Sequence, residues 1–290
     1  MFVVATVFKN EAPLLREWVE HYLLREGAAH LFMVDHGSTD EPKARVFPEY
    51  ADRITWFEDA RPFEPGVQTL LLNEHVLPKV ARGKCWVLVC DVDEYLYAPS
   101  SSDPTVAQVL RAMPEHVRRV WVPWKVFGGN GHRAAQPAEG VVRGFTRRAE
   151  GISLPYKCTA PGRYEAHLGL GKMLARGVTR LGVHESEAQG PNSKTVYQQV
   201  YQQVYQQVYG WDRAHTPAHL LTQLPQFPIL ELNHYMYMSR AYYEAVKCRR
   251  GGGQTGHGTG KYTLAYYDAT EPGCNAVKDE ALASKGISTV

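Results

Sequence analysis

Short apolar runs alternate with helix-like stretches along the first hundred residues. Four runs rich in β-branched and aromatic residues end in polar or turn-forming residues and predict buried strands: 2–8 (FVVATVF), 30–35 (HLFMVD), 53–59 (RITWFED) and 85–96 (CWVLVCDVDEYL). Residues 12–27 and 67–81 place apolar side chains at helical spacing; the first stretch stops at Gly27 and the second bends or ends near Pro78. Strands alternating with helices are typical of an α/β fold whose largely parallel sheet carries helices on both faces.

The second half of the chain has a different pattern, in which strand-like stretches are joined by loops. Three of them predict further strands and hence a mixed sheet: 118–133, 139–148 and 171–186. Residues 232–253 then predict a short strand followed by a helix that ends at glycines, so we expect a helical C-terminal part. Residues 251–290 are Gly-rich and polar with little periodicity, and they predict a loosely ordered tail.

One segment repeats the unit VYQQ over residues 196–209. On a helix a four-residue unit advances about 400°, so its apolar positions drift by only about 40° per repeat and form one broad face. On a strand, each face would mix apolar residues with glutamine. We therefore predict a helix, either a sequence duplication without functional meaning or a lid or oligomer contact.

The composition of the 290 residues is ordinary for a globular protein, with 44% hydrophobic residues, 21% charged residues and a formal net charge of +2. This near balance gives no reason to expect a nucleic acid or an anionic membrane as partner. The five cysteines form no CxxC pair, which favours reduced thiols. Neither a signal peptide nor an apolar run of about 20 residues is present, so we expect a soluble, cytoplasmic protein of unknown oligomeric state.

The fourth apolar run ends in two aspartates, Asp91 and Asp93. Residues i and i+2 of a strand share a face, and two carboxylates that lie so close repel each other unless a cation separates them. Hard oxygen ligands suit Mg²⁺ or Mn²⁺, so we predict a divalent metal site here. A phosphatase nucleophile of the DxDxT type does not fit, because the pair follows a fourth strand and Glu94-Tyr95 come next. The sequence GGGQTG (251–256) satisfies GxGxxG by letter, but it follows a predicted helix and is expected to be a flexible loop.

Several motifs taken together resemble a known enzyme family. They occur in this order: 7–40 (VFKNEAPLLREWVEHYLLREGAAHLFMVDHGSTD), 85–96, 124–132 (WKVFGGNGH), 171–177 (GKMLARG), 182–186 (GVHES) and 232–252. This set resembles the nucleotide-sugar glycosyltransferases of the GT-A fold and is nearest to the family-2-like and family-92 groups. The resemblance spans about residues 2–251; the VYQQ repeat and the tail match nothing in it.

The resemblance implies a Rossmann-like GT-A domain over residues 1–250, with a mixed, mostly parallel sheet flanked by helices. Residues 1–97 would form its nucleotide-binding half and residues 98–250, including the 196–209 repeat, its acceptor-side half, followed by the 251–290 tail. The implied reaction transfers a sugar from a UDP- or GDP-sugar to a glycan or other hydroxyl acceptor. A bound Mn²⁺ or Mg²⁺ would stabilise the leaving diphosphate.

The resemblance also implies roles for particular residues. Thr6, Phe8 and Asp35 would hold the nucleotide, Asp91 would contact the ribose or the metal, and Asp93 would bind the metal. A late histidine, His184 or alternatively His234, would complete the metal shell, and Lys172 would steady the diphosphate. If the reaction inverts the anomeric centre, a general base is required, for which His132, Glu165 and Glu185 are the candidates.

Two alternatives stay open at this point. The first is a nucleotidyltransferase on a related fold, although such enzymes usually carry a Gly-rich first loop and TVFKNEAP contains no glycine. The second is a non-catalytic domain that binds nucleotide sugars or carbohydrate.

Overall fold

The computed structural model describes most of the chain. The described residues are 1–81, 85–99, 102–113, 115, 117–134, 136–150, 171–184, 186–188, 194–197, 230–249 and 262–285.

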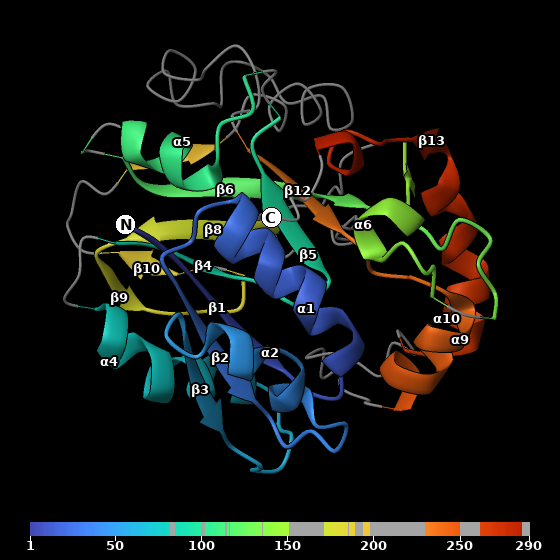
Figure 1. Cartoon of the computed structure of the whole chain (residues 1–290), viewed down its shortest axis with the longest axis horizontal. Coiled ribbons are helices and arrows are strands. Elements are labelled where there is room, and N and C mark those ends of the chain that lie inside the picture. Colours follow the sequence, from blue (N-terminus) through green and yellow to red (C-terminus); the bar gives the residue numbers. More distant parts are fainter. Residues whose placement is uncertain are drawn as a thin grey trace, which may run out of the picture.

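A mixed, mostly parallel sheet forms the centre of the molecule (Figure 1). Along the sheet the order is β3-β2-β1-β4-β8-β6-β12-β5, and β11 also pairs with β6. Its strands are β1 (Phe2–Phe8), β2 (His30–Asp35), β3 (Ile54–Glu58), β4 (Trp86–Val89), β5 (Glu94–Tyr97), β6 (Val117–Val126), β8 (Gly171–Arg176), β11 (Lys194–Tyr197) and β12 (Glu231–His234). Two short antiparallel pairs lie outside it: β9 (Val178–Arg180) with β10 (Glu187–Ala188), and β7 (Arg147–Arg148) with β13 (Val277–Lys278).

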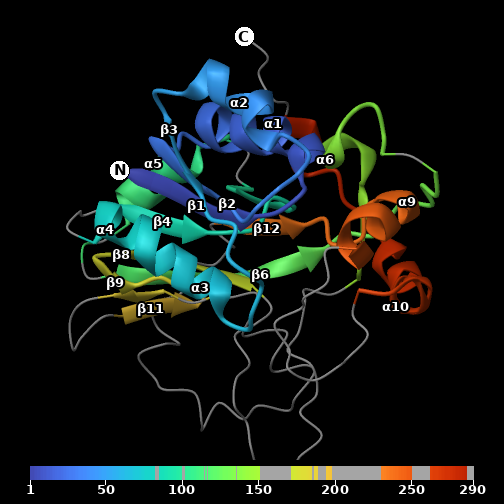
Figure 2. The same cartoon turned by 90° about the horizontal axis from the view of Figure 1, so that it is seen from below.

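Helices lie on both faces of this sheet and beyond the ends of some of its strands (Figure 2). They are α1 (Ala12–Glu20) with the π-helical η1 (His21–Arg25), α2 (Pro42–Tyr50), α3 (Val67–Leu71), η2 (Leu72–Val76), α4 (Leu77–Val80), α5 (Val106–Ala112), α6 (Val141–Gly144), α9 (Arg240–Tyr242), η4 (Tyr243–Cys248), α10 (Leu264–Thr270), η5 (Glu271–Asn275) and η6 (Ala283–Lys285). Figure 2 shows α1 and α2 on one side of the sheet, while α9 and α10 lie together beyond the carboxyl ends of β6 and β12. The predicted fold class, a Rossmann-like mixed α/β sheet with a helical C-terminal part, is confirmed.

The two faces of β1 explain this layering. Phe2, Val4 and Phe8 pack into the larger core cluster together with α1 and α5, whereas Val3 and Val7 pack with α3, η2 and α4 on the opposite face. Because side chains alternate along a strand, an almost fully apolar strand of this kind can be buried on both faces only between two helical layers.

The prediction of one strand over residues 85–96 was wrong. The chain forms β4, turns at Asp91–Asp93 and continues as β5 next to β12. A bond from the backbone nitrogen of Glu94 to the carbonyl of Asp91 (3.1 Å) closes the turn. Asp91 and Asp93 therefore belong to a turn between two buried strands, and their side chains are not held on one face of a strand.

The prediction of a loosely ordered tail was also wrong for residues 262–285. Asn275 Oδ1 accepts from the backbone nitrogen of Asn130 (3.0 Å), and Glu271 Oε1 accepts from that of Gly129 (2.7 Å). Tyr267 is buried against Tyr237 and Tyr243. This segment is thus docked on the loop that follows β6.

Two other expectations concern the middle of the chain. Residues 139–148 were expected to form a strand, but they form the short helix α6 and then β7. Of the repeat predicted as a helix over 196–209, residues 196 and 197 belong to strand β11. The remaining residues of the repeat lie outside the described part of the chain.

Asn275→Ala is expected to loosen the docked segment. The change removes the acceptor of the Asn130 backbone nitrogen and the 2.5 Å bond to Glu271. Leaving a buried polar group without its partner costs about 1–3 kcal/mol of stability. Hydrogen exchange should then accelerate in residues 262–285 before it does in β1. Lys278→Ala, at a side chain that is 62% exposed, is the control and should leave exchange unchanged. Equal acceleration in both regions would contradict a local docking role for Asn275.

Within the described residues, no helix combines the length and the apolar character that crossing a bilayer demands. The cysteines of this part, Cys85, Cys90, Cys248 and Cys274, are free thiols.

Candidate active site

Several strands end at the same edge of the sheet, where a polar cluster forms. β1, β2 and β3 run parallel, so Phe8, Asp35 and Glu58 lie side by side at their carboxyl ends. β4 ends there as well, and β12 reaches this edge with His234 paired to Glu94. In open α/β sheets, ligands bind beyond the carboxyl ends of the strands, so this edge is the candidate site.

The loops after β1 and β2 are bonded to each other. The backbone nitrogen of Asn10 donates to Ser38 Oγ (2.9 Å), and that of Thr39 donates to Asn10 Oδ1 (2.8 Å). Asp40 Oδ2 accepts from the backbone nitrogen of Ala12 (2.9 Å), so Asp40 caps the start of α1. These bonds fix the rim of the site next to Asp35.

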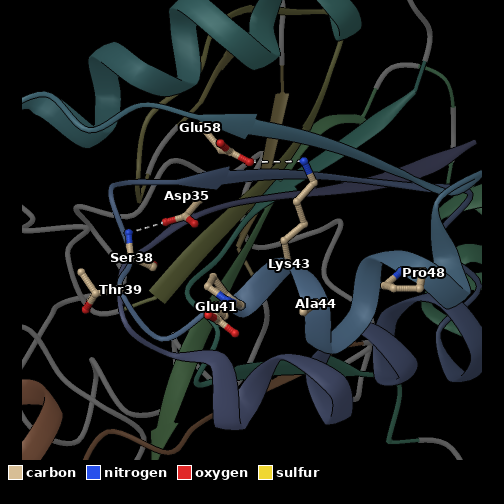
Figure 3. A pocket seen from close by; sticks show the side chains of 9 residues that line it. Asp35, Ser38, Thr39, Glu41, Lys43, Ala44, Pro48 and Glu58 are labelled. Atoms are coloured by element: carbon tan, nitrogen blue, oxygen red, sulfur yellow. Dashed lines mark hydrogen bonds and ion pairs between the residues drawn. The ribbon is translucent and has the colours of Figure 1, made fainter.

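Asp35 lies beside an open groove of about 570 Å³ (Figure 3). Asp35 is the last residue of β2, and its Oδ1 accepts from the backbone nitrogen of Ser38 (2.8 Å). This bond fixes the orientation of the carboxylate. The groove is lined by Asp35, Ser38, Thr39, Glu41, Pro42, Lys43, Ala44, Pro48 and Glu58. Lys43 reaches from α2 to Glu58 (3.2 Å), so the groove offers carboxylate acceptors more than free cations, which suits the hydroxyl and amino groups of a nucleoside.

The other two residues expected at the nucleotide lie deeper. Thr6 is fully buried within β1, and its Oγ1 has no hydrogen-bond partner in the part of the chain that the structure describes. Phe8 is 2% exposed and packs edge-on against Trp56 at 5.5 Å. In this arrangement Phe8 can offer a ligand only its backbone, and its carbonyl already accepts from His36 (2.9 Å).

Helix α1 holds the acidic turn in place. Trp18 Nε1 donates to the carbonyl of Asp91 (3.1 Å), and Tyr22 Oη donates to the carbonyl of Glu94 (3.0 Å). Trp18 and Tyr22 are four residues apart on the buried face of this helical segment and are fully buried. The amphipathic pattern of residues 12–27 therefore positions the turn as well as the core.

Asp91 and the buried Lys172 form the first of two ion pairs. Lys172 Nζ lies 3.1 Å from Asp91 Oδ2 and 3.3 Å from Glu94 Oε2, and it donates to the carbonyl of Val183 (2.9 Å). The Asp91 side chain is 39% exposed, whereas those of Lys172 and Glu94 are fully buried. Burial opposes ionisation of Asp91, but Lys172 together with His184 and His234 outweighs it, and the pKa of Asp91 is lowered.

Asp93 and Lys247 form the second ion pair. Lys247 Nζ lies 2.5 Å from Asp93 Oδ2 and 2.6 Å from the carbonyl of Met236, and the lysine side chain is 3% exposed. Although burial opposes its ionisation, Lys247 and then His234 hold the pKa of Asp93 well below its ordinary value. Asp93 Oδ1 is buried and has no hydrogen-bond partner among the described residues.

Both candidate histidines flank Trp124. The His234 ring lies 4.3 Å from that of Trp124 and the His184 ring 5.6 Å. His234 Nε2 is 3.6 Å from Asp93 Oδ2, and its buried Nδ1 has no partner within the described ranges. Burial lowers the pKa of His234 despite Asp93, so its ring is neutral at pH 7. His184, which was preferred from sequence, bonds through Nδ1 to the carbonyl of Gly171 (3.3 Å) and helps to lower the pKa of Asp91, whereas His234 lies within ion-pair distance of Asp93.

Of the three candidate general bases, the structure describes one. His132 follows β6, packs edge-on against Phe145 at 5.6 Å and is held through its backbone by Gly129 and Arg240. Glu165 and Glu185 lie outside the described residues.

A divalent cation does not fit the acidic turn as the described residues arrange it. Each aspartate already has a lysine counter-ion, and the oxygen and nitrogen atoms of Asp91, Asp93 and the histidines are not gathered within 4.8 Å. A cation on Asp93 Oδ2 would displace Lys247, and breaking a buried ion pair costs about 3–5 kcal/mol. A cation on the free Oδ1 would instead be repelled by the nearby ammonium. The expected metal role of Asp91 and Asp93 stays a prediction that this geometry does not favour.

Elsewhere in the described part of the chain, one group of potential metal ligands has its ligand atoms within 4.8 Å of one another. It consists of Asp59, Glu74 and His75. Arg61 already occupies it, with bonds to Asp59 (2.7 Å) and Glu74 (2.8 Å). We assign no metal to this group.

Sequence reasoning missed Lys247. The sequence feature that could have identified it is its spacing: Lys247 lies four residues after Tyr243, on the same face of the helix as that buried tyrosine. A charged residue on a buried helix face is rare unless it has a partner.

Comparisons with known proteins give partial likenesses only. No protein-family model and no curated protein matches the chain. Among solved structures, it is similar to a mannosyltransferase from Pyrobaculum calidifontis in complex with GDP-Man and Mn²⁺, with 20% identity, a TM-score of 0.32, and coverage of 42% of this chain and 34% of that one. It is also similar to S. aureus TarS 1–349 in complex with UDP (16%, TM-score 0.30, coverage 47% and 38%) and to HddC from Yersinia pseudotuberculosis (8%, 0.32, coverage 52% and 68%). The matched part of this chain spans about a third of the mannosyltransferase, and no residue role is transferred from these proteins.

Proposed function

We propose that this chain transfers a sugar from a nucleoside diphosphate sugar, with UDP or GDP as the leaving group, to a hydroxyl group of a glycan or another acceptor. One observation carries the proposal: Asp91 and Asp93 occur with two lysines and His234 at the sheet edge where Asp35 borders an open groove. The motifs that resemble GT-A glycosyltransferases contain all three aspartates in the expected order.

The groove beside Asp35 is proposed to hold the nucleoside. Its carboxylate can accept hydrogen bonds from ribose hydroxyls or from a base amino group, and the Ser38 backbone bond keeps it oriented. The partly exposed Asp91 is proposed to accept from a hydroxyl of the ribose or the sugar. The buried acceptors Asp93 Oδ1 and His234 Nδ1, with the His234 proton on Nε2, would each be satisfied by a hydroxyl hydrogen.

In the proposed reaction the acceptor oxygen bonds to the anomeric carbon. The bond from that carbon to the phosphate oxygen breaks, its electron pair stays on the diphosphate, and the hydroxyl proton passes to a general base. Inversion is part of the proposal, and His132, Glu165 and Glu185 stay candidates for the base. Lys172 is proposed to position Asp91, because its ammonium is buried among the carboxylates.

The test is release of UDP or GDP from a panel of nucleotide sugars and simple glycan acceptors, assayed both with Mn²⁺ and with EDTA. Turnover supports transfer, and the nature of the product separates transfer from hydrolysis. Binding of nucleotide without turnover on any acceptor would favour the non-catalytic binding domain. Absence of both binding and turnover under every condition would overturn the proposal.

Asp35→Asn is expected to weaken UDP or GDP binding by about 10–100-fold, because a hydrogen bond to a charged group contributes about 1.5–3 kcal/mol. Titration calorimetry measures the change. The matched control is Asp52→Asn, at an exposed aspartate before β3, which should bind as the unchanged protein does. Equal affinities for all three proteins would remove Asp35 from the nucleotide site.

A further inference from the structure

The acidic turn carries as many ammonium groups as aspartates. Lys172 pairs with Asp91 and Lys247 pairs with Asp93, at 3.1 Å and 2.5 Å. Both lysines come from elements distant in sequence, β8 and η4, and both are almost completely buried. Their charges occupy the place where the resemblance implies a dication.

Lys247 is the lysine that can serve a ligand. An ammonium has three N–H donors, and in the described residues two of them are used, by Asp93 Oδ2 and the carbonyl of Met236. The three hydrogen-bond donors of Lys172 already have Asp91, Glu94 and Val183 around them. Lys247 therefore retains one donor, beside the unpartnered atoms Asp93 Oδ1 and His234 Nδ1.

The helix that carries Lys247 is held firmly. Ser239 Oγ accepts from the backbone nitrogen of Tyr242 (3.2 Å) and caps α9. Tyr243 packs with Tyr237 and Tyr267. The ammonium is thus positioned before any ligand arrives, which is the condition under which a fixed charge stabilises a developing one.

We propose that this site binds the diphosphate of its donor without a divalent metal, the ammonium of Lys247 donating to a phosphate oxygen in the place of the cation. This inference rests on the proposed function and specifies how the leaving group is stabilised. When the bond between the anomeric carbon and the phosphate oxygen breaks, the electron pair remains on the diphosphate, and the charge of Lys247 stabilises it. Asp93 keeps the ammonium oriented.

The first test uses the unaltered protein. Binding of UDP and GDP is titrated by calorimetry in EDTA and in Mn²⁺, and Mn²⁺ binding is followed separately by its electron paramagnetic resonance signal. The expected affinities in EDTA and Mn²⁺ agree within about threefold, and the signal of free Mn²⁺ is not diminished by the protein. An affinity at least about tenfold higher in Mn²⁺, with loss of the free-ion signal, overturns the inference but leaves the proposed function standing. Absence of binding under both conditions overturns the proposed function itself.

The second test assigns the effect to Lys247. Lys247→Met is expected to lose about 10–100-fold in affinity for UDP but little for UMP or uridine, a difference that a merely structural role would not produce. If the protein binds GDP and not UDP, the affinity for GDP is compared with the affinities for GMP and guanosine in the same way. Lys247→Arg keeps the charge and should restore most of the affinity for the diphosphate.

Two further variants keep the second test decisive. The control Lys285→Met removes another largely buried lysine, bonded to Ala98 and Asp103 away from the site, and should bind UDP normally. If Lys247→Met does not fold, Asp93→Asn/Lys247→Met removes both charges, and a selective loss of diphosphate binding is expected there too. Normal UDP binding by a folded protein without Lys247 overturns the inference.

Discussion

Asp93→Asn is expected to lower the free energy of unfolding by about 3–5 kcal/mol, because it leaves the ammonium of Lys247 buried without a counter-ion. Lys247 is 3% exposed, and its other described partner is the neutral carbonyl of Met236. Lys247→Met should destabilise by a similar amount, since it leaves the Asp93 carboxylate buried with His234 as its remaining described partner. Denaturant unfolding monitored by circular dichroism measures both changes.

The double variant Asp93→Asn/Lys247→Met decides whether these losses share one cause. If they do, it should be much more stable than the sum of the single changes predicts, with a coupling of about 2 kcal/mol or more. The exposed pair Arg16–Glu49 is the control: Glu49→Gln should change stability little, because its side chain is 55% exposed. Simple additivity in the double variant would show that the two side chains do not form a buried ion pair in solution.

The strands and the first helix could be predicted because each has a strong local period. Phe2–Phe8 is apolar throughout and lies at the centre of the sheet, where both faces are covered. The helical pattern from Ala12 ends where Gly27 takes a positive φ of 71°, a conformation that glycine adopts without strain. These features are determined by residues that are close together in the sequence, so they can be predicted from one sequence alone.

The turn between β4 and β5 was missed because the interruption of the apolar pattern is too short to separate two strands from one. Both strands are buried, and Asp91 and Asp93 interrupt the run for only three residues. Helices α2 and α5 also went unnoticed, although Thr105 and Gln108 form a capping box at the start of α5. In the tail, the glycines of 251–256 masked the apolar residues of Leu264–Thr270 that follow.

The partners of the acidic turn could not be predicted because they are distant in sequence. Lys172 is 81 residues from Asp91, and Lys247 is 154 residues from Asp93. No periodicity relates such positions; only the sheet order, which places β8 beside β4 and β12 beside β5, brings them together. The two aspartates could be singled out from the sequence, while the lysines that neutralise them became visible only in the fold.

Raising the pH is expected to destabilise the protein through Glu26. This glutamate is fully buried, and its Oε2 accepts from the backbone nitrogen of Val106 at the start of α5 (2.9 Å). Burial raises the pKa of Glu26 from 4.5 to about 7, against the opposing effects of the Val106 bond and of Arg25. The folded protein therefore holds the proton between these two values while the unfolded chain has lost it.

The sign follows from this difference in bound protons. Where the folded state binds more protons, stability falls as the pH rises, so the effect is absent below about pH 4.5, grows up to pH 7 and is complete above it. A pKa shift of this size corresponds to a change of about 3 kcal/mol in the free energy of unfolding. Glu26→Gln keeps an acceptor for Val106 and removes the titration, so its stability relative to the unchanged protein should rise by about 3 kcal/mol from pH 4.5 to pH 8. The exposed Glu139→Gln serves as the control for denaturant unfolding across this range. A constant difference between Glu26→Gln and the unchanged protein at all pH values would mean that Glu26 ionises normally in the fold, and hence that the interface between η1 and α5 admits water.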